Sequence, residues 1–249
     1  MNKFLLIGSD GYLGSYFKKH LKKKNKIVID YKYKDFYSNK SLEIFKNKVD
    51  FVIHFAISKS LDKKKNFHHD IKFAKKLFIF CKKNKIKCYY ISSISAFKKN
   101  KSFYSQLKNK IENIAVKSNI KIIKPGMVWS NSPKSWFGNI NEIVNKCFFF
   151  IPLIGNGSHH IYLVNINDFT ETLFKILKKN RVNKFVIHHK DTFAFRDIIK
   201  KIFIKKNKIN ILIPIPSFLI FLIFKFLYKI KVLSSGTYDS LQSYRYAKK

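Results

Sequence analysis

The chain has 249 residues, of which 46% are hydrophobic, and it carries a formal net charge of +37. This apolar content is sufficient for a packed core, which excludes an intrinsically disordered chain. The charge comes almost entirely from lysine spread along the sequence, because arginine occurs only at Arg181, Arg196 and Arg245. Since bidentate readers of phosphates and bases favour arginine, we interpret the charge as a compositional bias and expect no specific nucleic-acid partner.

The first half of the chain alternates strand and helix patterns. Residues 4–7 form an apolar strand pattern, which a glycine turn joins to a helical pattern that reaches about residue 21. Elements of both kinds then alternate, with strands at 26–29, 51–56, 88–91 and 121–124 and helices at 69–83 and 103–117. This order predicts an α/β fold, a Rossmann-type doubly wound parallel sheet that binds ligands at the carboxyl ends of its strands.

The second half of the chain is less regular and predicts a small C-terminal lobe. Helices are expected at 168–178 and 195–204, and a strand at 185–188. We therefore place a Rossmann domain at residues 1–130. A small substrate lobe at 131–249 is expected to return in part to the Rossmann sheet.

The cysteines exclude two further classes of protein. Cys81, Cys88 and Cys147 form no CxxC pair and have no histidine at metal-ligand spacing. The sequence therefore predicts neither a disulfide framework nor a metal site. We expect a protein of the reducing cytoplasm, because the N-terminal residues also lack the pattern of a secretion signal.

The glycine turn predicts a dinucleotide site. Gly8, Gly11 and Gly14 allow a tight turn, a close approach of backbone to a pyrophosphate, and close packing of helix on strand. The helix N-terminus then faces the phosphates. Asp30, at the end of the second strand, would hold the adenosine ribose hydroxyls, which favours NAD over NADP. NADP stays open, because the lysines that follow Asp30 would accommodate a 2'-phosphate.

A second set of residues predicts acid/base chemistry. Tyr104 and Lys108 stand at positions i and i+4 of a predicted helix, so they share one face. The lysine, together with a positive nicotinamide ring, would lower the pKa of the phenol toward neutrality, where it exchanges a proton with a substrate hydroxyl or carbonyl. Ser93, at the end of the preceding strand, would orient the same substrate oxygen. Glu112 follows at the next helical step.

The order of these motifs resembles a known family. The segments LLIGSDGYLGS, VDFVIHFA, YYISSISAF, YSQLKNKIE and IIKPGMVW occur as in extended short-chain dehydrogenases/reductases, specifically the NAD-dependent epimerase/dehydratase family that acts on nucleotide sugars. The resemblance covers about residues 1–178. It implies an NAD(P)-dependent nucleotide-sugar epimerase or reductase of surface polysaccharide synthesis. The alternative is a noncatalytic Rossmann protein that holds a dinucleotide for structure or sensing.

The resemblance also assigns roles to residues. It implies a catalytic trio of Ser93, Tyr104 and Lys108, of which Ser93 and Tyr104 also bind substrate, and we add Lys134 as a substrate anchor. The residues expected to bind the dinucleotide are Gly8, Asp10, Gly11, Tyr12, Leu13, Gly14, Asp30, His54, Phe55, Ala56, Tyr104, Lys108, Pro125, Gly126 and Val128.

Two positions depart from the family pattern. Ile94 and Ser95 follow Ser93 where 4,6-dehydratases of this family have Asp-Glu, which argues against a dehydratase. Asp70 stands where the family usually has an asparagine, so the hydrogen bonds around this position are expected to differ.

The C-terminal region contains the best membrane candidate. The apolar run at 209–224 is shorter than a spanning helix needs and contains Pro214 and Pro216, so we expect no transmembrane segment. A helix over 217–230 either packs on the second lobe or lies on an anionic membrane surface, and both alternatives stay open. The family resemblance leaves a homodimer open as well.

Overall fold

The chain folds into two compact units. The computed structural model describes residues 2–32, 35, 41–58, 64–97, 99–130, 150–179, 183–204, 211–230 and 238–239. The first unit comprises Met1–Pro125 and Ile166–Ile187, and the second comprises Gly126–Asn165 and His188–Lys249. The chain therefore leaves the first unit after Pro125 and returns to it for one helix and one strand.

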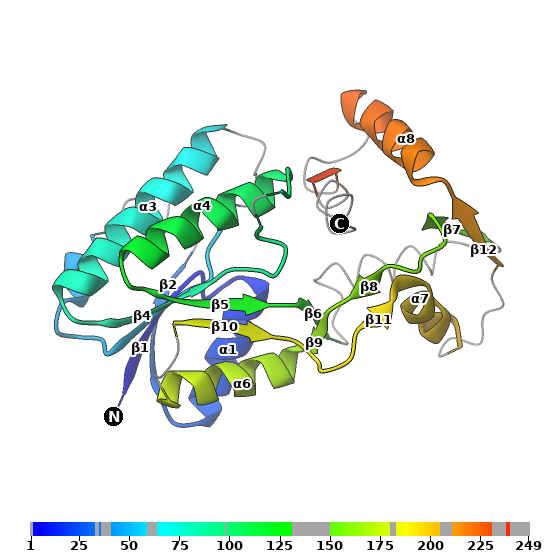
Figure 1. Cartoon of the computed structure of the whole chain (residues 1–249). Coiled ribbons are helices and arrows are strands. Elements are labelled where there is room, and N and C mark those ends of the chain that lie inside the picture. Colours follow the sequence, from blue (N-terminus) through cyan, green and yellow to red (C-terminus); the bar gives the residue numbers. More distant parts are fainter. Residues whose placement is uncertain are drawn as a thin grey trace. The chain divides into compact units, whose positions relative to one another are not determined.

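A six-stranded parallel sheet forms the centre of the first unit (Figure 1). In spatial order its strands are β10 (Lys184–Ile187), β5 (Lys121–Pro125), β4 (Lys87–Ile91), β3 (Phe51–His54), β1 (Lys3–Ile7) and β2 (Ile27–Tyr31). The central strands are nearly continuous apolar runs, because helices cover both faces of the sheet. The order reverses at β1, and doubly wound sheets bind ligands outside the carboxyl ends of their strands at such a point.

Two pairs of helices cover this sheet. Figure 1 shows α3 (Lys64–Lys83) and α4 (Phe103–Lys117) on one face, and α1 (Tyr12–Lys23) and α6 (Ile166–Lys179) on the other. The apolar side chains of α3 and α4 share one core cluster with those of β1, β3 and β4. A short 3-10 helix, η1 (Glu43–Phe45), lies between β2 and β3. The predicted doubly wound α/β fold is confirmed.

The second unit is built from short strand pairs and two helices. Its described elements are β6 (Met127–Trp129), β7 (Phe150–Ile154), β8 (His160–Ile161), β9 (Leu163–Asn165), β11 (Phe193–Ala194), α7 (Phe195–Ile204), β12 (Ile211–Ile215) and α8 (Ser217–Lys229). Strands β6 and β9 pair in parallel, as do β7 and β12, whereas β8 and β11 are antiparallel. The core of this unit is formed by apolar side chains of β7, β8, β9 and α7.

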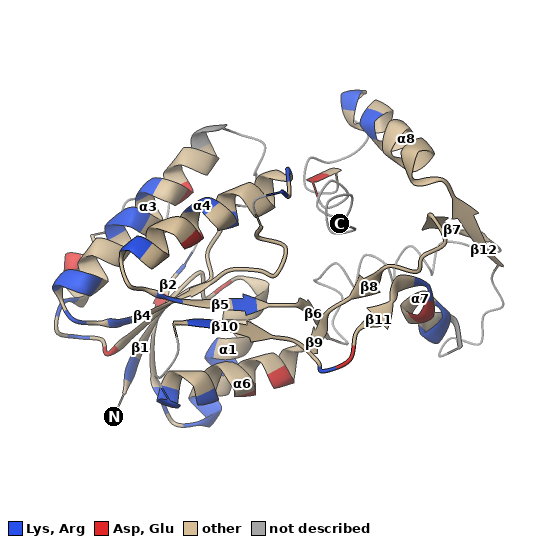
Figure 2. Ribbon diagram, in the orientation of Figure 1, with Lys and Arg blue, Asp and Glu red and all other residues tan. Residues whose placement is uncertain are grey.

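Lysine and arginine occur on helices of both units and do not concentrate on one element (Figure 2). This distribution agrees with the interpretation of the charge as a compositional bias. Within the described ranges, no helix has the length and apolar character needed to cross a membrane.

Candidate functional site

The turn between β1 and α1 leaves no room for side chains at two of its glycines. Gly8 has a φ of +84°, and a Cβ atom at this position would lie 2.9 Å from the Cα of Ala56. A Cβ atom on Gly14 would overlap the carbonyl oxygen of Gly8, which also accepts a hydrogen bond from the amide of Gly11 at 3.1 Å. Glycine is therefore required at both positions.

Helix α1 begins at this turn with an end that suits an anion. Its N-cap is Gly11, no side chain accepts a hydrogen bond at the cap, and the first turn contains no acidic residue. Backbone N–H groups and the helix dipole favour negative charge at such an end. The backbone just after β3 closes the other side, because the amides of Phe55 and Ala56 donate to the Ile7 carbonyl at 2.9 and 3.1 Å. A glycine cradle with an uncapped helix end fits the pyrophosphate of a dinucleotide.

Asp30 lies beside this cradle, near the carboxyl end of β2, but its carboxylate already has a cationic partner. Lys18 on α1 donates to Oδ2 of Asp30, and both side chains are partly exposed. Burial raises the pKa of Asp30, whereas the Lys18 ammonium and the nearby Ser9 hydroxyl lower it, and the net pKa lies below its ordinary value. Asp30 is therefore held as a carboxylate at neutral pH, and a ribose would share it with Lys18.

His54 ends β3 and points into the core. Its imidazole is buried against the rings of Phe73, Phe78 and Tyr90, and its Nδ1 has no hydrogen-bond partner among the described residues. Burial, and to a smaller extent the charge of Lys108, lowers the pKa of His54 to about 3. The imidazole is thus a neutral packing group.

Helix α4 brings the tyrosine and the lysine to the end of β4. Ser102 caps this helix, its hydroxyl accepting from the Ser105 amide at 3.2 Å, so Tyr104 lies in the first turn. Lys108 follows one turn later, and its Nζ lies 5.8 Å from the centroid of the Tyr104 ring. The predicted pair therefore shares one face of α4.

Tyr104 lies in an environment that keeps its phenol neutral. Burial raises the pKa of Tyr104 to about 12, although the hydroxyl of Ser93 lowers it. The ammonium of Lys108 donates to the Ile91 carbonyl at 2.6 Å. Tyr104 is therefore protonated at neutral pH, and the expected shift toward neutrality, which also needs the positive nicotinamide ring, stays a prediction.

Lys108 itself is buried, and its charge is costly. Its Nζ lies 4.9 Å from the Tyr90 ring centroid. Burial lowers the pKa of Lys108 to about 8, against smaller opposite effects of the carboxylates of Asp70 and Glu112. The lysine thus titrates closer to neutral pH than an exposed lysine does.

This shift predicts a pH-dependent stability. Below about pH 8 Lys108 is charged in the folded and unfolded states, so its burial destabilises the protein. Between that pH and about 10.5 the unfolded chain binds more protons, so the free energy of unfolding should rise with pH. Across this window the free energy of unfolding of wild type should rise by about 3 kcal/mol relative to that of Lys108→Met. Urea unfolding of both proteins measures the difference, and parallel pH profiles would contradict the lowered pKa.

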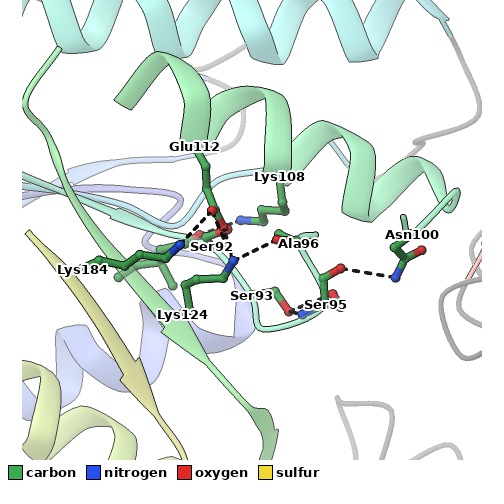
Figure 3. Close-up of polar contacts among 10 residues, drawn as sticks. Ser92, Ser93, Ser95, Ala96, Asn100, Lys108, Glu112, Lys124 and Lys184 are labelled. Atoms are coloured by element: carbon green, nitrogen blue, oxygen red, sulfur yellow. Dashed lines mark hydrogen bonds and ion pairs between the residues drawn. The ribbon is translucent and has the colours of Figure 1, made fainter. Parts of the chain in front are cut away.

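A cluster of charges, centred on the buried carboxylate of Glu112, lies beside the loop that carries Ser93 (Figure 3). Glu112 on α4 accepts from the Ser92 hydroxyl at 2.5 Å and forms an ion pair with Lys124 of β5 at 2.9 Å. Lys184 of β10 lies 4.0 Å from the second carboxylate oxygen and is largely exposed. Glu112 therefore links the helix of the tyrosine to the strand that follows it.

Hydrogen bonds to Lys124 and to the end of β5 hold the loop that carries Ser93. The Nζ of Lys124 donates to the Ala96 carbonyl at 2.8 Å, and the amide of Ile94 donates to the Pro125 carbonyl at 3.1 Å. Within the loop, the hydroxyls of Ser93 and Ser95 lie 2.9 Å apart (Figure 3). Ser93 is thus held at the carboxyl edge of the sheet by both neighbours.

We expect Glu112→Ala to lower the free energy of unfolding by about 3–5 kcal/mol, because Lys124 would be left buried without its carboxylate. The double variant Glu112→Leu/Lys124→Met should recover most of this loss, since it removes both charges together. Urea denaturation of wild type, the single variants and the double variant tests this. A loss in the double variant equal to the sum of the two single losses would show that the pair is not coupled.

Structural comparison finds extensive similarity to solved enzymes. A dTDP-4-dehydrorhamnose reductase from Clostridium acetobutylicum superposes with a TM-score of 0.73 at 17% identity, over 86% of this chain and 84% of that chain. A dTDP-glucose 4,6-dehydratase from Bacillus anthracis gives 0.70 at 15% identity, over 86% and 84%. A UDP-N-acetylglucosamine 4-epimerase from Bacillus cereus gives 0.69 at 22% identity, over 87% and 86%. No family model and no curated protein matches the sequence.

The chain has the fold of these solved enzymes. The fold implied by the sequence resemblance is thereby confirmed. In this fold the glycine turn, Asp30, Ser93 and Pro125 stand at or just beyond the carboxyl ends of neighbouring parallel strands of one sheet. The structure thus brings most of the predicted site residues to one edge of the first unit.

Asp70 has a structural partner within the first unit. It is buried on α3 and accepts hydrogen bonds from both the amide and the hydroxyl of Ser58, the amide at 2.8 Å. Burial raises the pKa of Asp70, against the lowering effect of these hydrogen bonds. An acceptor-only carboxylate suits two donors, which explains how the fold accommodates the departure from the usual asparagine.

The remaining predicted residues lie at and after the end of β5. Gly126 begins the second unit, and a Cβ atom there would overlap the carbonyl oxygen of Tyr162, which accepts from the Met127 amide at 2.7 Å. Val128 is half-buried on β6. Lys134, the predicted substrate anchor, lies outside the described residues.

Sequence reasoning gave no role to Glu112 and did not identify Lys124. Glu112 stands one helical turn beyond Lys108, and Lys124 is a charged residue within the apolar strand pattern 121–124. A charged residue on a strand that is buried on both faces needs a partner of opposite charge. Lys124 within the apolar pattern could therefore have predicted a buried ion pair.

Proposed function

We propose that this protein is an NAD(P)-dependent nucleotide-sugar epimerase or reductase in which Tyr104, Lys108 and Ser93 perform the acid/base chemistry. One observation carries the proposal. Ser93, whose hydroxyl lowers the pKa of Tyr104, and the glycine cradle after β1 occur at the carboxyl edge of the same parallel sheet. Doubly wound sheets bind their ligands at this edge.

The residues of the cradle would hold the dinucleotide. The backbone from Gly11 to Gly14 would face the pyrophosphate, Asp30 would accept from the adenosine ribose, and Lys108 would donate to the nicotinamide ribose. The bound nicotinamide would supply the hydride donor or acceptor and, when oxidised, a positive charge that favours a tyrosinate. Solved structures with this fold contain NADP or NAD, which supports either cofactor.

Tyr104 would exchange the proton with the reacting sugar oxygen. Because its pKa of about 12 keeps the phenol protonated, it can donate to a carbonyl oxygen as that oxygen gains negative charge. Ser93 would donate a second hydrogen bond to the same oxygen and fix its orientation. In the oxidative direction the same atoms act in reverse, the tyrosinate accepting the hydroxyl proton.

A nucleotide sugar is the substrate class that similar folds support. The similar enzymes are named for dTDP-linked and UDP-linked sugars, and one was crystallised with UDP-glucose and NAD. By the family resemblance, the product would enter surface polysaccharide synthesis. The retained Tyr/Lys pair favours an enzyme over a noncatalytic binding protein.

Cofactor titration followed by a substrate panel tests the proposal. Purified protein is titrated with NAD, NADP and their reduced forms, and then incubated with UDP- and dTDP-linked sugars and 4-keto sugars. Epimer formation without net consumption of cofactor would identify an epimerase, whereas stoichiometric oxidation of added NADH or NADPH would identify a reductase. Dinucleotide binding without turnover of any substrate would favour the noncatalytic alternative, and no dinucleotide binding would overturn the proposal.

A further inference from the structure

Helix α8 of the second unit presents an apolar stripe to solvent. Ile220 is its only buried residue, whereas Phe218, Leu222 and Phe226 are 64%, 59% and 62% exposed. The apolar stripe consists of Phe218, Leu219, Leu222, Ile223, Phe226 and the adjoining Ile230. These positions follow one another at one, three and four residues, so they share one face of the helix.

Two lysines border this stripe. Lys225 follows Phe218 by two helical turns, and Lys229 follows Leu222 by the same spacing, so both lie along one edge of the apolar face. Neither α8 nor the preceding strand β12 contains an acidic residue. The surroundings of the stripe are therefore purely cationic along these two elements.

The length and charge of α8 select the surface that would cover it. At about 1.5 Å per residue its 13 residues extend about 20 Å, less than the roughly 30 Å of a bilayer's hydrocarbon core. A helix of this length instead lies in the interface plane, with apolar side chains among acyl chains and lysines at the phosphates. A second copy of this chain is poorly suited to cover the stripe, because each chain carries a net charge of +37 and two copies repel one another.

We propose that α8 docks this protein on the surface of a bilayer of anionic phospholipids. The apolar stripe enters the acyl boundary, and Lys225 and Lys229 contact lipid phosphates. The charge of the whole chain adds long-range attraction to the same surface. The sequence left this alternative open beside packing on the second lobe, and the exposed stripe favours it.

Vesicle flotation tests the docking. The stripe variant Phe218→Ser/Leu222→Ser/Phe226→Ser is compared with wild type and with a matched control, Ile44→Ser/Ile79→Ser/Val116→Ser, which removes three exposed apolar side chains of the first unit. Vesicles contain either phosphatidylcholine alone or phosphatidylcholine with phosphatidylglycerol. We expect wild type and the control to bind the anionic vesicles, and the stripe variant to bind them at least about tenfold more weakly.

Circular dichroism shows whether the stripe variant is folded. If it is misfolded, a second variant with a single substitution tests the docking instead. In Phe226→Trp, nitroxide-labelled lipids should quench tryptophan emission beyond the quenching seen in wild type. The proposal is overturned if wild type does not bind anionic vesicles, or if a correctly folded stripe variant binds them as tightly as wild type. It is also overturned if wild type forms a dimer that the stripe variant does not form, and wild type binds no vesicles. None of these measurements requires a sugar substrate, so their failure is distinguishable from failure of the proposed catalytic function.

Discussion

Tyr104→Phe is expected to lower turnover by about 10²–10⁴-fold, the range by which positioned proton transfer accelerates reactions. The phenol of Tyr104, protonated at neutral pH, is the proton donor at the proposed site, and phenylalanine has no proton to donate. Phenylalanine retains the ring that lies beneath the Lys108 amine, so folding and dinucleotide binding should be preserved. The effect should therefore fall on the chemical step.

Turnover of NADH or NADPH with the active sugar substrate, measured beside dinucleotide affinity, checks this result. Tyr228→Phe is a matched control, because this tyrosine belongs to α8 and is not among the residues proposed to bind the dinucleotide or the substrate. An unchanged rate in Tyr104→Phe would remove the tyrosine from the mechanism. A parallel loss of dinucleotide affinity would instead indicate that the hydroxyl maintains the shape of the site.

Gly14→Ala should weaken dinucleotide binding. The new methyl group would overlap the carbonyl oxygen of Gly8, so helix α1 would have to move away from β1 and from the turn. Because the amide of Gly11 donates to the same carbonyl, this movement also disturbs the helix end that faces the pyrophosphate. We expect at least about a tenfold loss of dinucleotide affinity and a loss of about 2 kcal/mol in the free energy of unfolding.

Fluorescence titration with NADH and NADPH, together with urea unfolding, measures both effects. Ser15→Ala is the control, since its hydroxyl hydrogen-bonds only locally, to the Tyr12 carbonyl at 3.0 Å. Wild-type affinity in Gly14→Ala would mean that the cradle is not the pyrophosphate site. Lost affinity with unchanged stability would mean that the turn adapts to the methyl group without cost to the fold.

The contrast between Lys108 and Lys124 shows how far sequence reasoning reached into the site. The i, i+4 spacing was enough to place Lys108 on the face of Tyr104, because helical periodicity is a local property. It did not reveal that Lys108 donates to the Ile91 carbonyl, nor that Lys124 is buried against Glu112. Those contacts join residues from different strands and helices, and no local pattern specifies them.

The sequence by itself determined the alternation of strands and helices, the glycine turn and the Tyr/Lys face, since each depends on neighbours within a few residues. Tertiary structure decided which side chains meet and how strongly water is excluded. It paired Asp30 with Lys18, raised the pKa of Tyr104 by burying its side chain, and left the apolar stripe of α8 exposed. Burial and long-range charge pairing arise only when distant segments pack together, so these properties required the folded chain.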